Sequence, residues 1–219
     1  MKTLTKPYSL ATNLSCSNCK KEYSLTEINS YAICCDKPLV VDYDLSSAPE
    51  KPALSSTQNT MWRYADLLPV LNKQNIVSLG EGMTPILHLY KLADRYGFAE
   101  LLMKDESFNP TGSFKARGIS MAVSKAKELG ITECIVPTAG NAGGALAAYC
   151  AKAGIKCTVI MPSHTPKVFK QECELYGAEL ILVDGLINDC AKKVAALNKD
   201  NQYFDISTLK EPYRIEGKK

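Results

Sequence analysis

The run Phe108-Asn-Pro-Thr-Gly-Ser-Phe-Lys115 joins a strand-like segment to a helical one. Residues 100–106, before it, alternate apolar and polar side chains, which is typical of a strand. After it, apolar side chains recur with helical spacing, so we expect a helix over 113–129. The proline and the glycine of the run break the strand, and Ser113 can cap the helix by accepting a backbone N–H.

The turn places Lys115 in the first turn of the expected helix. This position is unusual for a cation, because the helix dipole is positive there. The same field lowers the pKa of an amine, and a lysine needs a lowered pKa to act as a nucleophile. A lone lysine at such a place is most often a surface residue that tolerates it. Here the neighbouring sequence favours a nucleophilic role.

The composition is that of a globular protein with one or two domains. The chain has 219 residues, 46% of them hydrophobic, and can bury a sizeable core. Its 26 basic and 23 acidic residues give a net charge of +3 without a long basic block. The first residues lack the apolar stretch of a secretory signal, and no run reaches the roughly 18 apolar residues of a membrane-spanning helix. We therefore expect no nucleic-acid partner and no membrane.

The chain contains nine cysteines, an odd number. Five of them occur singly within helical or strand-like segments, at Cys134, Cys150, Cys157, Cys173 and Cys190. Scattered thiols are typical of a reducing compartment and not of a disulfide framework. We therefore expect a cytoplasmic protein.

The other four cysteines belong to a small module at 1–45. Cys16 and Cys19 form a C-x2-C turn, and the adjacent pair Cys34 and Cys35 follows. Four thiolates can hold one zinc ion tetrahedrally, as in a zinc ribbon, although two adjacent cysteines can share an ion only where the backbone bends. The alternative is a ribbon that has lost its metal and keeps small buried thiols. Neither version is catalytic, because four thiolates leave no open coordination position.

Residues 46–75 read as a linker or an arm. Residues 46–60 are rich in serine, proline and alanine, which indicates an extended connection. A short amphipathic segment follows at 61–71. Farther along, 89–96 is predicted to form a helix that ends at Gly97.

From residue 100 onward strand-like and helical segments alternate, beginning with the strand at 100–106 and the helix at 113–129. We expect strands at 133–138, 156–161, 178–183 and 202–206, and helices at 144–153, 166–176 and 187–198. This alternation indicates βαβ units and a parallel sheet covered on both faces. Ligands of such sheets bind beyond the carboxyl ends of the strands, so we expect the turns at 107–115 and 138–144 to face one cleft.

The turn Thr138-Ala-Gly-Asn-Ala-Gly-Gly144 consists of small residues and opens a helix. Its free backbone N–H groups can bind a carboxylate or a phosphate, and Asn141 adds a side-chain amide. The alternative is an ordinary tight turn whose glycines only permit close packing. The turn matches neither the dinucleotide pattern G-x-G-x-x-G nor a phosphate loop ending in G-K-[ST].

Three motifs together resemble those of the fold-type II pyridoxal-phosphate (PLP) enzymes, and among these the threonine synthases. The motifs are Ser78-Leu-Gly-Glu-Gly-Met-Thr-Pro85, Asn109-Pro-Thr-Gly-Ser-Phe-Lys-Ala-Arg-Gly118 and Pro137-Thr-Ala-Gly-Asn-Ala-Gly143. The resemblance covers nearly the whole chain. It implies an α/β fold of three αβα layers with parallel sheets, preceded by the zinc-ribbon-like module. The implied domains are 76–129 with the reactive lysine, a small α/β domain at 130–210, and a return to the large domain at 211–219.

The resemblance also implies roles for single residues. Lys115 would form the Schiff base with pyridoxal 5′-phosphate and then shuttle protons, and Phe114 would lie beside the cofactor. Asn141 would donate a hydrogen bond to the ring's 3′-oxygen. The backbone that would hold the α-carboxylate of the amino-acid substrate comprises Thr138, Ala139, Gly140, Asn141 and Ala142. In threonine synthases this substrate is O-phospho-L-homoserine, which reacts with water to give L-threonine and phosphate.

One departure from the family concerns the glycine-rich loop that grips the cofactor phosphate. In the family this loop lies in a C-terminal half, whereas here only isolated glycines occur after residue 144, so we expect the chain to be the N-terminal half of an enzyme. Three alternatives remain open. They are another lyase of this fold, such as a threonine or serine ammonia-lyase or a cysteate synthase; a non-catalytic remnant, which could self-associate as a homodimer; and a zinc-ribbon nucleic-acid binder, which the near-neutral charge disfavours.

Overall fold

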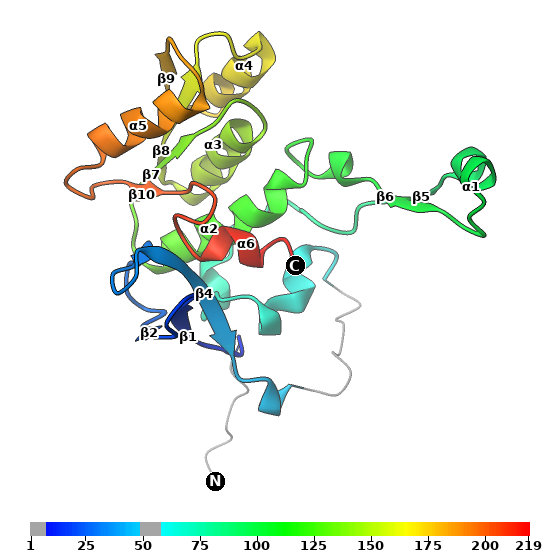
Figure 1. Ribbon diagram of the computed structural model, residues 1–219, viewed down its shortest axis with the longest axis horizontal. Helices are drawn as coiled ribbons and strands as arrows, with labels where there is room; N and C mark the ends of the chain where they lie inside the picture. Colours follow the sequence, from blue (N-terminus) through cyan, green and yellow to red (C-terminus); the bar gives the residue numbers. More distant parts are fainter. Residues whose placement is uncertain (1–7, 49–57) are drawn as a thin grey trace.

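The computed structural model of the chain describes residues 8–48 and 58–219 (Figure 1). Residues 49–57 of the expected linker lie outside the described residues. Three short 3-10 helices border this segment or follow it: η1 (Leu45–Ser47), η2 (Met61–Leu67) and η3 (Lys73–Asn75). Trp62 in η2 is only 1% exposed. The second part of the expected linker therefore belongs to the core and is not a free arm.

The N-terminal module is a four-stranded antiparallel sheet. Its strands are β1 (Ala11–Cys16), β2 (Glu22–Tyr23), β3 (Tyr31–Ala32) and β4 (Lys37–Tyr43), in the order β2-β1-β4-β3. Leu14 and Leu39 are buried between this sheet and the rest of the chain. The N–H of Leu10 donates to the carbonyl oxygen of Asp66 at 2.8 Å, which fixes the module to η2.

The second half of the chain forms the parallel sheet that the sequence predicts. Its strands are β7 (Glu133–Pro137), β8 (Lys156–Pro162), β9 (Glu179–Val183) and β10 (Phe204–Asp205), in the order β10-β7-β8-β9. The helices between them are α3 (Ala142–Ala153), α4 (Lys167–Leu175) and α5 (Ile187–Leu197). Cys134 and Val136 belong to the main core with α3, whereas Ile135 packs with α5 on the other face. Side chains alternate along a strand, so this division confirms a sheet covered on both faces.

The strand expected at 100–106 forms, but it does not belong to the parallel sheet. β6 (Leu102–Lys104) pairs antiparallel with β5 (Ile86–His88), and the helix α1 (Tyr90–Tyr96) connects them. This two-stranded arm extends away from the rest of the chain (Figure 1). Gly97 ends α1 with a φ of 71°, as predicted. The prediction that the turn at 107–115 follows a strand of the parallel sheet is therefore wrong, because the alternating pattern of β6 does not specify its partner.

Helix α2 (Lys115–Glu128) lies between the parallel sheet and the N-terminal sheet (Figure 1). It packs against α3 and against the short C-terminal helix α6 (Tyr213–Glu216), and the 3-10 helix η4 (Glu106–Phe108) precedes it. It begins at Lys115, two residues later than expected. The hydroxyl of Ser113 accepts the backbone N–H of Lys115 at 3.3 Å, but the N-cap position is occupied by Phe114, which has no side-chain capping hydrogen bond.

No helix among the described residues is long and apolar enough to cross a membrane. All nine cysteines are free thiols. The domain boundaries at 129 and 210 remain a prediction.

Candidate functional site

A cavity of about 300 Å³ lies at the carboxyl edge of the parallel sheet. Its walls come from Lys115, Pro137, Thr138, Ala139, Gly140, Asn141, Ala142, Ile187, Ser207, Thr208 and Arg214. The two turns singled out in the sequence therefore face one cavity, as predicted. Lys115 reaches it because α2 packs beside α3, and not because a strand of the same sheet leads into it.

Lys115 is the first residue of α2 and is half-buried. Within the described part of the chain its Nζ has no hydrogen-bond acceptor and no carboxylate partner, and it lies 4.5 Å from the ring centroid of Phe114. Burial, together with the positive charge of Arg214, lowers the pKa of Lys115. The sequence also predicted a lowered pKa for Lys115. The two causes, burial and Arg214, both come from the tertiary structure. An amine in this setting is unprotonated more often than a surface lysine, which favours attack on a carbonyl carbon.

The turn before α3 presents unpaired donors to the same cavity. The backbone N–H groups of Ala139, Asn141 and Ala142 have no acceptor among residues 8–48 and 58–219. The Asn141 side chain is exposed and, in the same ranges, has no hydrogen-bond partner. Thr138 Oγ1 accepts the N–H of Gly140 at 3.2 Å and so holds the turn in shape. The geometry is that of an anion cradle at a helix N-terminus.

The glycines of this turn divide into two groups. A Cβ on Gly143 would lie 2.6 Å from Met161 Cε and 3.0 Å from Cys173 Sγ, so this glycine permits close packing of α3. A Cβ on Gly140 would meet only Phe169, at 3.9 Å. The packing alternative raised from the sequence therefore applies to Gly143, while the space around Gly140 is open to a ligand.

Arg214 of α6 completes the cavity and was missed in the sequence, because a single arginine outside any periodic segment gives no signal. Arg214 is only 3% exposed. Its Nη1 donates to the carbonyl oxygen of Ile206 at 2.6 Å, whereas Nε has no hydrogen-bond partner among the described residues. The buried carboxylate of Glu211 accepts the backbone N–H of Arg214 at 2.9 Å and holds the start of α6. A buried guanidinium with an unpaired N–H is suited to binding an anion.

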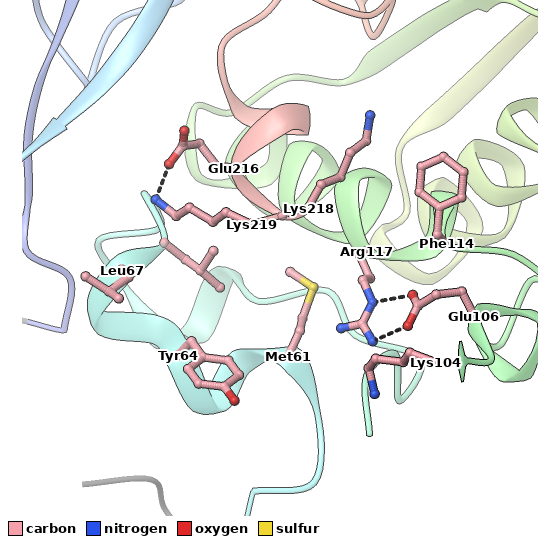
Figure 2. A pocket seen from close by; sticks show the side chains of 12 residues that line it. Met61, Tyr64, Leu67, Lys104, Glu106, Phe114, Arg117, Glu216, Lys218 and Lys219 are labelled. Carbon is pink, nitrogen blue, oxygen red and sulfur yellow. Dashed lines mark hydrogen bonds and ion pairs between the residues drawn. The ribbon is translucent and has the colours of Figure 1, made fainter. Parts of the chain in front are cut away.

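Phe114 and Lys218 line a different, larger cavity of about 620 Å³ (Figure 2). Phe114 lines this cavity and is absent from the walls of the smaller one. Lys218 lies 5.7 Å from the same ring, and burial with the charges of Arg214 and Lys115 lowers its pKa. Two lysines with lowered pKa therefore lie close to the ring of Phe114, and of these two only Lys115 lines the cavity with the cradle.

The motif at 78–85 positions α2 and α3 through a buried carboxylate. Glu81 is 0% exposed, and it accepts hydrogen bonds from Trp62 Nε1 at 2.9 Å, Ser120 Oγ at 2.6 Å and the hydroxyl of Tyr149 at 2.6 Å. Ser120 belongs to α2 and Tyr149 to α3. Because these two helices begin at Lys115 and Ala142, Glu81 fixes the relative position of the two halves of the site.

A second ionic network holds η4 against α2. Arg117 donates from Nε and Nη2 to the two carboxylate oxygens of Glu106, at 2.6 and 2.8 Å (Figure 2). Thr84 donates to Glu106 at 2.6 Å and Asn109 at 3.0 Å. These hydrogen bonds to its charged form lower the pKa of Glu106 to about 2.

From the ion pair of Glu106 and Arg117 we predict that the stability of the fold depends on pH. The pKa of Glu106 is lower in the folded chain than in the unfolded one, so its contribution is present above about pH 4.5 and is lost as the pH falls toward about 2. With 27% of the side chain exposed, we expect a loss on the order of 2 kcal/mol. Urea unfolding of the native chain and of Glu106→Gln tests this. The stability difference between them should shrink from about pH 6 to about pH 3; a constant difference would contradict the assignment.

The four N-terminal cysteines also come together. The Sγ atoms of Cys16, Cys19, Cys34 and Cys35 all lie within 4.8 Å of one another. This cluster belongs to the antiparallel module and contributes nothing to the walls of the Lys115 cavity.

Comparisons with known proteins show which family the chain is similar to. A family model described as pyridoxal-phosphate dependent enzyme matches residues 77–219. The threonine synthase of Methanocaldococcus jannaschii is 36% identical over 93% of this chain and 51% of its own length. That of a Bacillus species is 40% identical over 72% of this chain and 44% of its own length. The chain spans about half the length of the curated relatives it matches.

Solved structures show the same fold. The crystal structure of a pyridoxal 5′-phosphate-dependent aspartate racemase has a TM-score of 0.57 and 31% identity, covering 61% of this chain and 42% of its own. Diaminopropionate ammonia lyase from Escherichia coli has a TM-score of 0.58, covering 64% of this chain and 45% of its own. Its identity is 20%, so this second likeness concerns the fold alone.

Proposed function

The chain belongs to the pyridoxal-phosphate dependent enzyme family, and from that premise we propose that it carries the lysine-bearing part of a threonine synthase. The reaction would convert O-phospho-L-homoserine and water to L-threonine and phosphate. The observation that carries the proposal is the Lys115 amine, which has no hydrogen-bond acceptor and no carboxylate partner within the described residues and faces the same cavity as the donors of 139–142. The threonine synthases at 36–40% identity support this choice of reaction.

The donor set of the cavity fits pyridoxal phosphate. Lys115 offers an amine with a lowered pKa, and Asn141 offers an amide donor to an oxygen of the ring. When bound, the cofactor supplies an aldehyde that condenses with amines and a ring that withdraws electrons from the substrate's α-carbon. The described residues also leave three backbone N–H groups for a carboxylate.

The chain's own residues would then divide the work as follows. The N–H groups of Ala139, Asn141 and Ala142 bind the substrate's α-carboxylate at the N-terminus of α3, where the helix dipole favours negative charge. This contact fixes the α-carbon near Lys115 Nζ. The amine of Lys115, when unprotonated, can accept a proton from a substrate carbon and later return it. Burial supports this role, because it lowers the pKa of the ammonium form.

Arg214 would bind the substrate's phosphate. Arg214 belongs to the cavity wall, and its positive charge favours an anion bound there. A phosphate bound there lies in the same cavity as the carboxylate cradle, so the two anionic ends of one substrate are held at once. Thr208, which lines the same wall, adds a hydroxyl donor, whereas the Ser207 hydroxyl already donates to Asp205.

A substrate panel tests the proposal. We expect phosphate release from O-phospho-L-homoserine, with little ammonia released from threonine or serine. Arg214→Gln should lower kcat/KM for the phosphorylated substrate by about 10²-fold or more, since a charge-assisted contact to phosphate is lost. Arg214→Lys, which keeps the charge, should recover part of it. Ammonia release at a higher rate than phosphate release would identify another lyase of this fold instead.

A further inference from the structure

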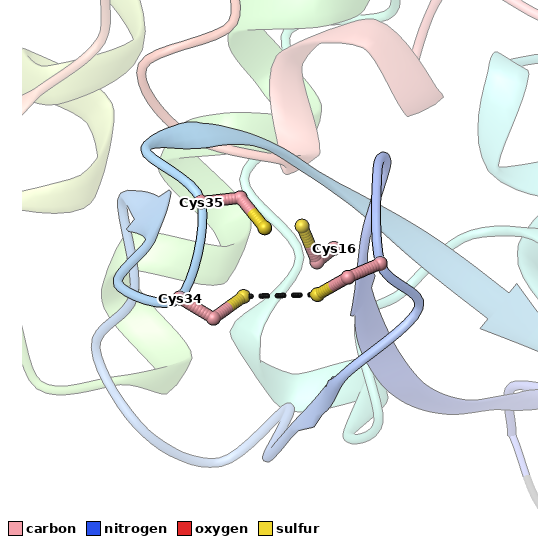
Figure 3. A group of neighbouring side chains, drawn as sticks. Cys16, Cys34 and Cys35 are labelled. Atoms are coloured by element: carbon pink, nitrogen blue, oxygen red, sulfur yellow. Dashed lines mark hydrogen bonds between the residues drawn. The ribbon is translucent and has the colours of Figure 1, made fainter.

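The cysteine cluster has the dimensions of a mononuclear metal site. The four Sγ atoms lie within 4.8 Å of one another, and those of Cys19 and Cys34 are 3.2 Å apart (Figure 3). Zinc binds sulfur at about 2.3 Å in a tetrahedron, whose edges are then about 3.8 Å long. A spread of sulfur atoms on this scale leaves room for one ion at the centre.

The backbone explains how two adjacent cysteines can share one site. In the first turn, the N–H of Lys20 donates to the carbonyl oxygen of Cys16, and Lys20 has a φ of 63°. In the second, the N–H of Asp36 donates to the carbonyl oxygen of Ala32, and Asp36 has a φ of 49°. Both turns therefore close over the same number of residues and end in a left-handed residue, a conformation that is rare outside glycine.

The two turns have the same backbone geometry but carry their cysteines at different positions. Cys19 and Cys35 both directly precede the left-handed residue. The counterpart of Cys16 in the second turn is Ala32, which carries no thiol, and Cys34 supplies the fourth sulfur instead (Figure 3). The bend that the sequence required for an adjacent pair is thus present.

Polar contacts around the sulfurs suit thiolates. Asn18 Nδ2 donates to Cys35 Sγ at 3.4 Å. The backbone N–H of Cys34 donates to the hydroxyl of Tyr23 at 3.2 Å, which fixes the second turn beside the sulfurs. Lys20 and Lys21 directly follow Cys19, so positive charge stands beside a site that would carry net negative charge. Such outer contacts orient ligands and stabilise a bound ion.

We propose that Cys16, Cys19, Cys34 and Cys35 hold one structural zinc ion. Four thiolates close the coordination sphere, so the ion has no position for a substrate. Its role is to fix the small antiparallel sheet, because a module of this size buries too little apolar surface to be stable by itself. The proposal does not depend on the proposed catalytic function.

The fixed module in turn supports the wall that carries Arg214. Lys210 Nζ lies 5.0 Å from the ring of Tyr31, and the hydroxyl of Tyr43 donates to the carboxylate of Glu216. Tyr31 belongs to β3, one residue before Ala32 of the second turn, and Tyr43 belongs to β4. The segment 207–216 therefore rests on the sheet that the ion would hold.

Metal analysis of the purified chain tests the proposal directly. We expect about one zinc per chain, and cobalt exchanged into the site should show thiolate charge-transfer absorption. Cys19→Ser and Cys34→Ser should each lower the zinc content at least about tenfold after dialysis against a chelator, because a ligand is lost. Both thiols are exposed, so these substitutions disturb the core little.

Three control variants separate a metal site from a general loss of structure. Ser17→Ala, in the same turn, and Cys190→Ala, in α5, should keep the zinc. Cys19→His should keep much of it, because imidazole is also a zinc ligand. A chain without zinc after expression in zinc-supplemented medium would overturn the proposal. So would a mass about 2 Da lower under non-reducing conditions, the sign of a disulfide, or a stoichiometric content of iron.

Discussion

Replacing Lys115 by alanine is expected to prevent the covalent attachment of pyridoxal phosphate and to lower the reaction rate at least about 10³-fold. The structure gives the reason. The Lys115 amine faces the cradle of the 138–142 turn, has no hydrogen-bond acceptor and no carboxylate partner among the described residues, and has a pKa lowered by burial and by Arg214. Among residues 8–48 and 58–219, no other lysine lines this cavity. The measurement is borohydride reduction of the chain with pyridoxal phosphate, followed by peptide mass spectrometry.

Lys218 provides a matched control for this experiment. Its pKa is lowered by the same kinds of neighbours, and it lies on the same Phe114 ring, but it lines the other cavity. Lys218→Ala should therefore keep the pyridoxyl label on Lys115. If a lowered pKa alone decided which amine is labelled, both Lys115 and Lys218 would carry the pyridoxyl label. A label on Lys218 that persists in the native chain, with Lys115 unmodified, would refute the assignment.

The second large effect concerns stability. Glu81→Ala is expected to lower the free energy of unfolding by about 3–5 kcal/mol, because the buried hydroxyl of Tyr149 loses its acceptor and Trp62 Nε1 keeps only the longer hydrogen bond to Ser120 Oγ at 3.2 Å. Ser120 keeps one acceptor, the carbonyl oxygen of Val77 at 2.8 Å, and is affected less. Urea unfolding measures the change.

Glu133→Ala is the control for Glu81→Ala. Glu133 forms a surface pair with Lys156, whose side chain is 80% exposed, so its removal should cost less than about 1 kcal/mol. If the two variants lose similar stability, Glu81 does not organise the core as argued. Because Glu81 joins α2 to α3, its replacement should also weaken the labelling of Lys115. A destabilised chain with full labelling would show that the two helices hold their positions without it.

Periodic patterns in the sequence identified the elements of the second half of the chain. The strands β7, β8 and β9 and the helices between them lie within two residues of their expected bounds. This was possible because βαβ units are local: each strand pairs with a neighbour that follows after one helix. The arm of β5 and β6 shows the limit of such patterns. Alternation indicated a strand at 100–106, but its antiparallel partner at 86–88 is too short to show a period.

The residues of the site likewise divide into those that local sequence predicts and one that depends on the tertiary structure. The sequence predicted the amine of Lys115 after Ser113 and the donors of the small-residue turn at 138–144. This was possible because both depend on local backbone geometry. Arg214, by contrast, comes from a helix of only four residues with no periodic signal.

By itself the sequence determined which elements form and which turns carry donors and an amine, since these depend on neighbours along the chain. Only the tertiary structure decided that α2 brings its amine to the edge of a sheet to which the preceding strand does not belong. It also decided that Glu81 holds α2 and α3 together, and that the adjacent pair Cys34 and Cys35 meets the C-x2-C turn. The physical reason is that these contacts join residues far apart in the chain, where burial and packing, and not local propensity, set the positions.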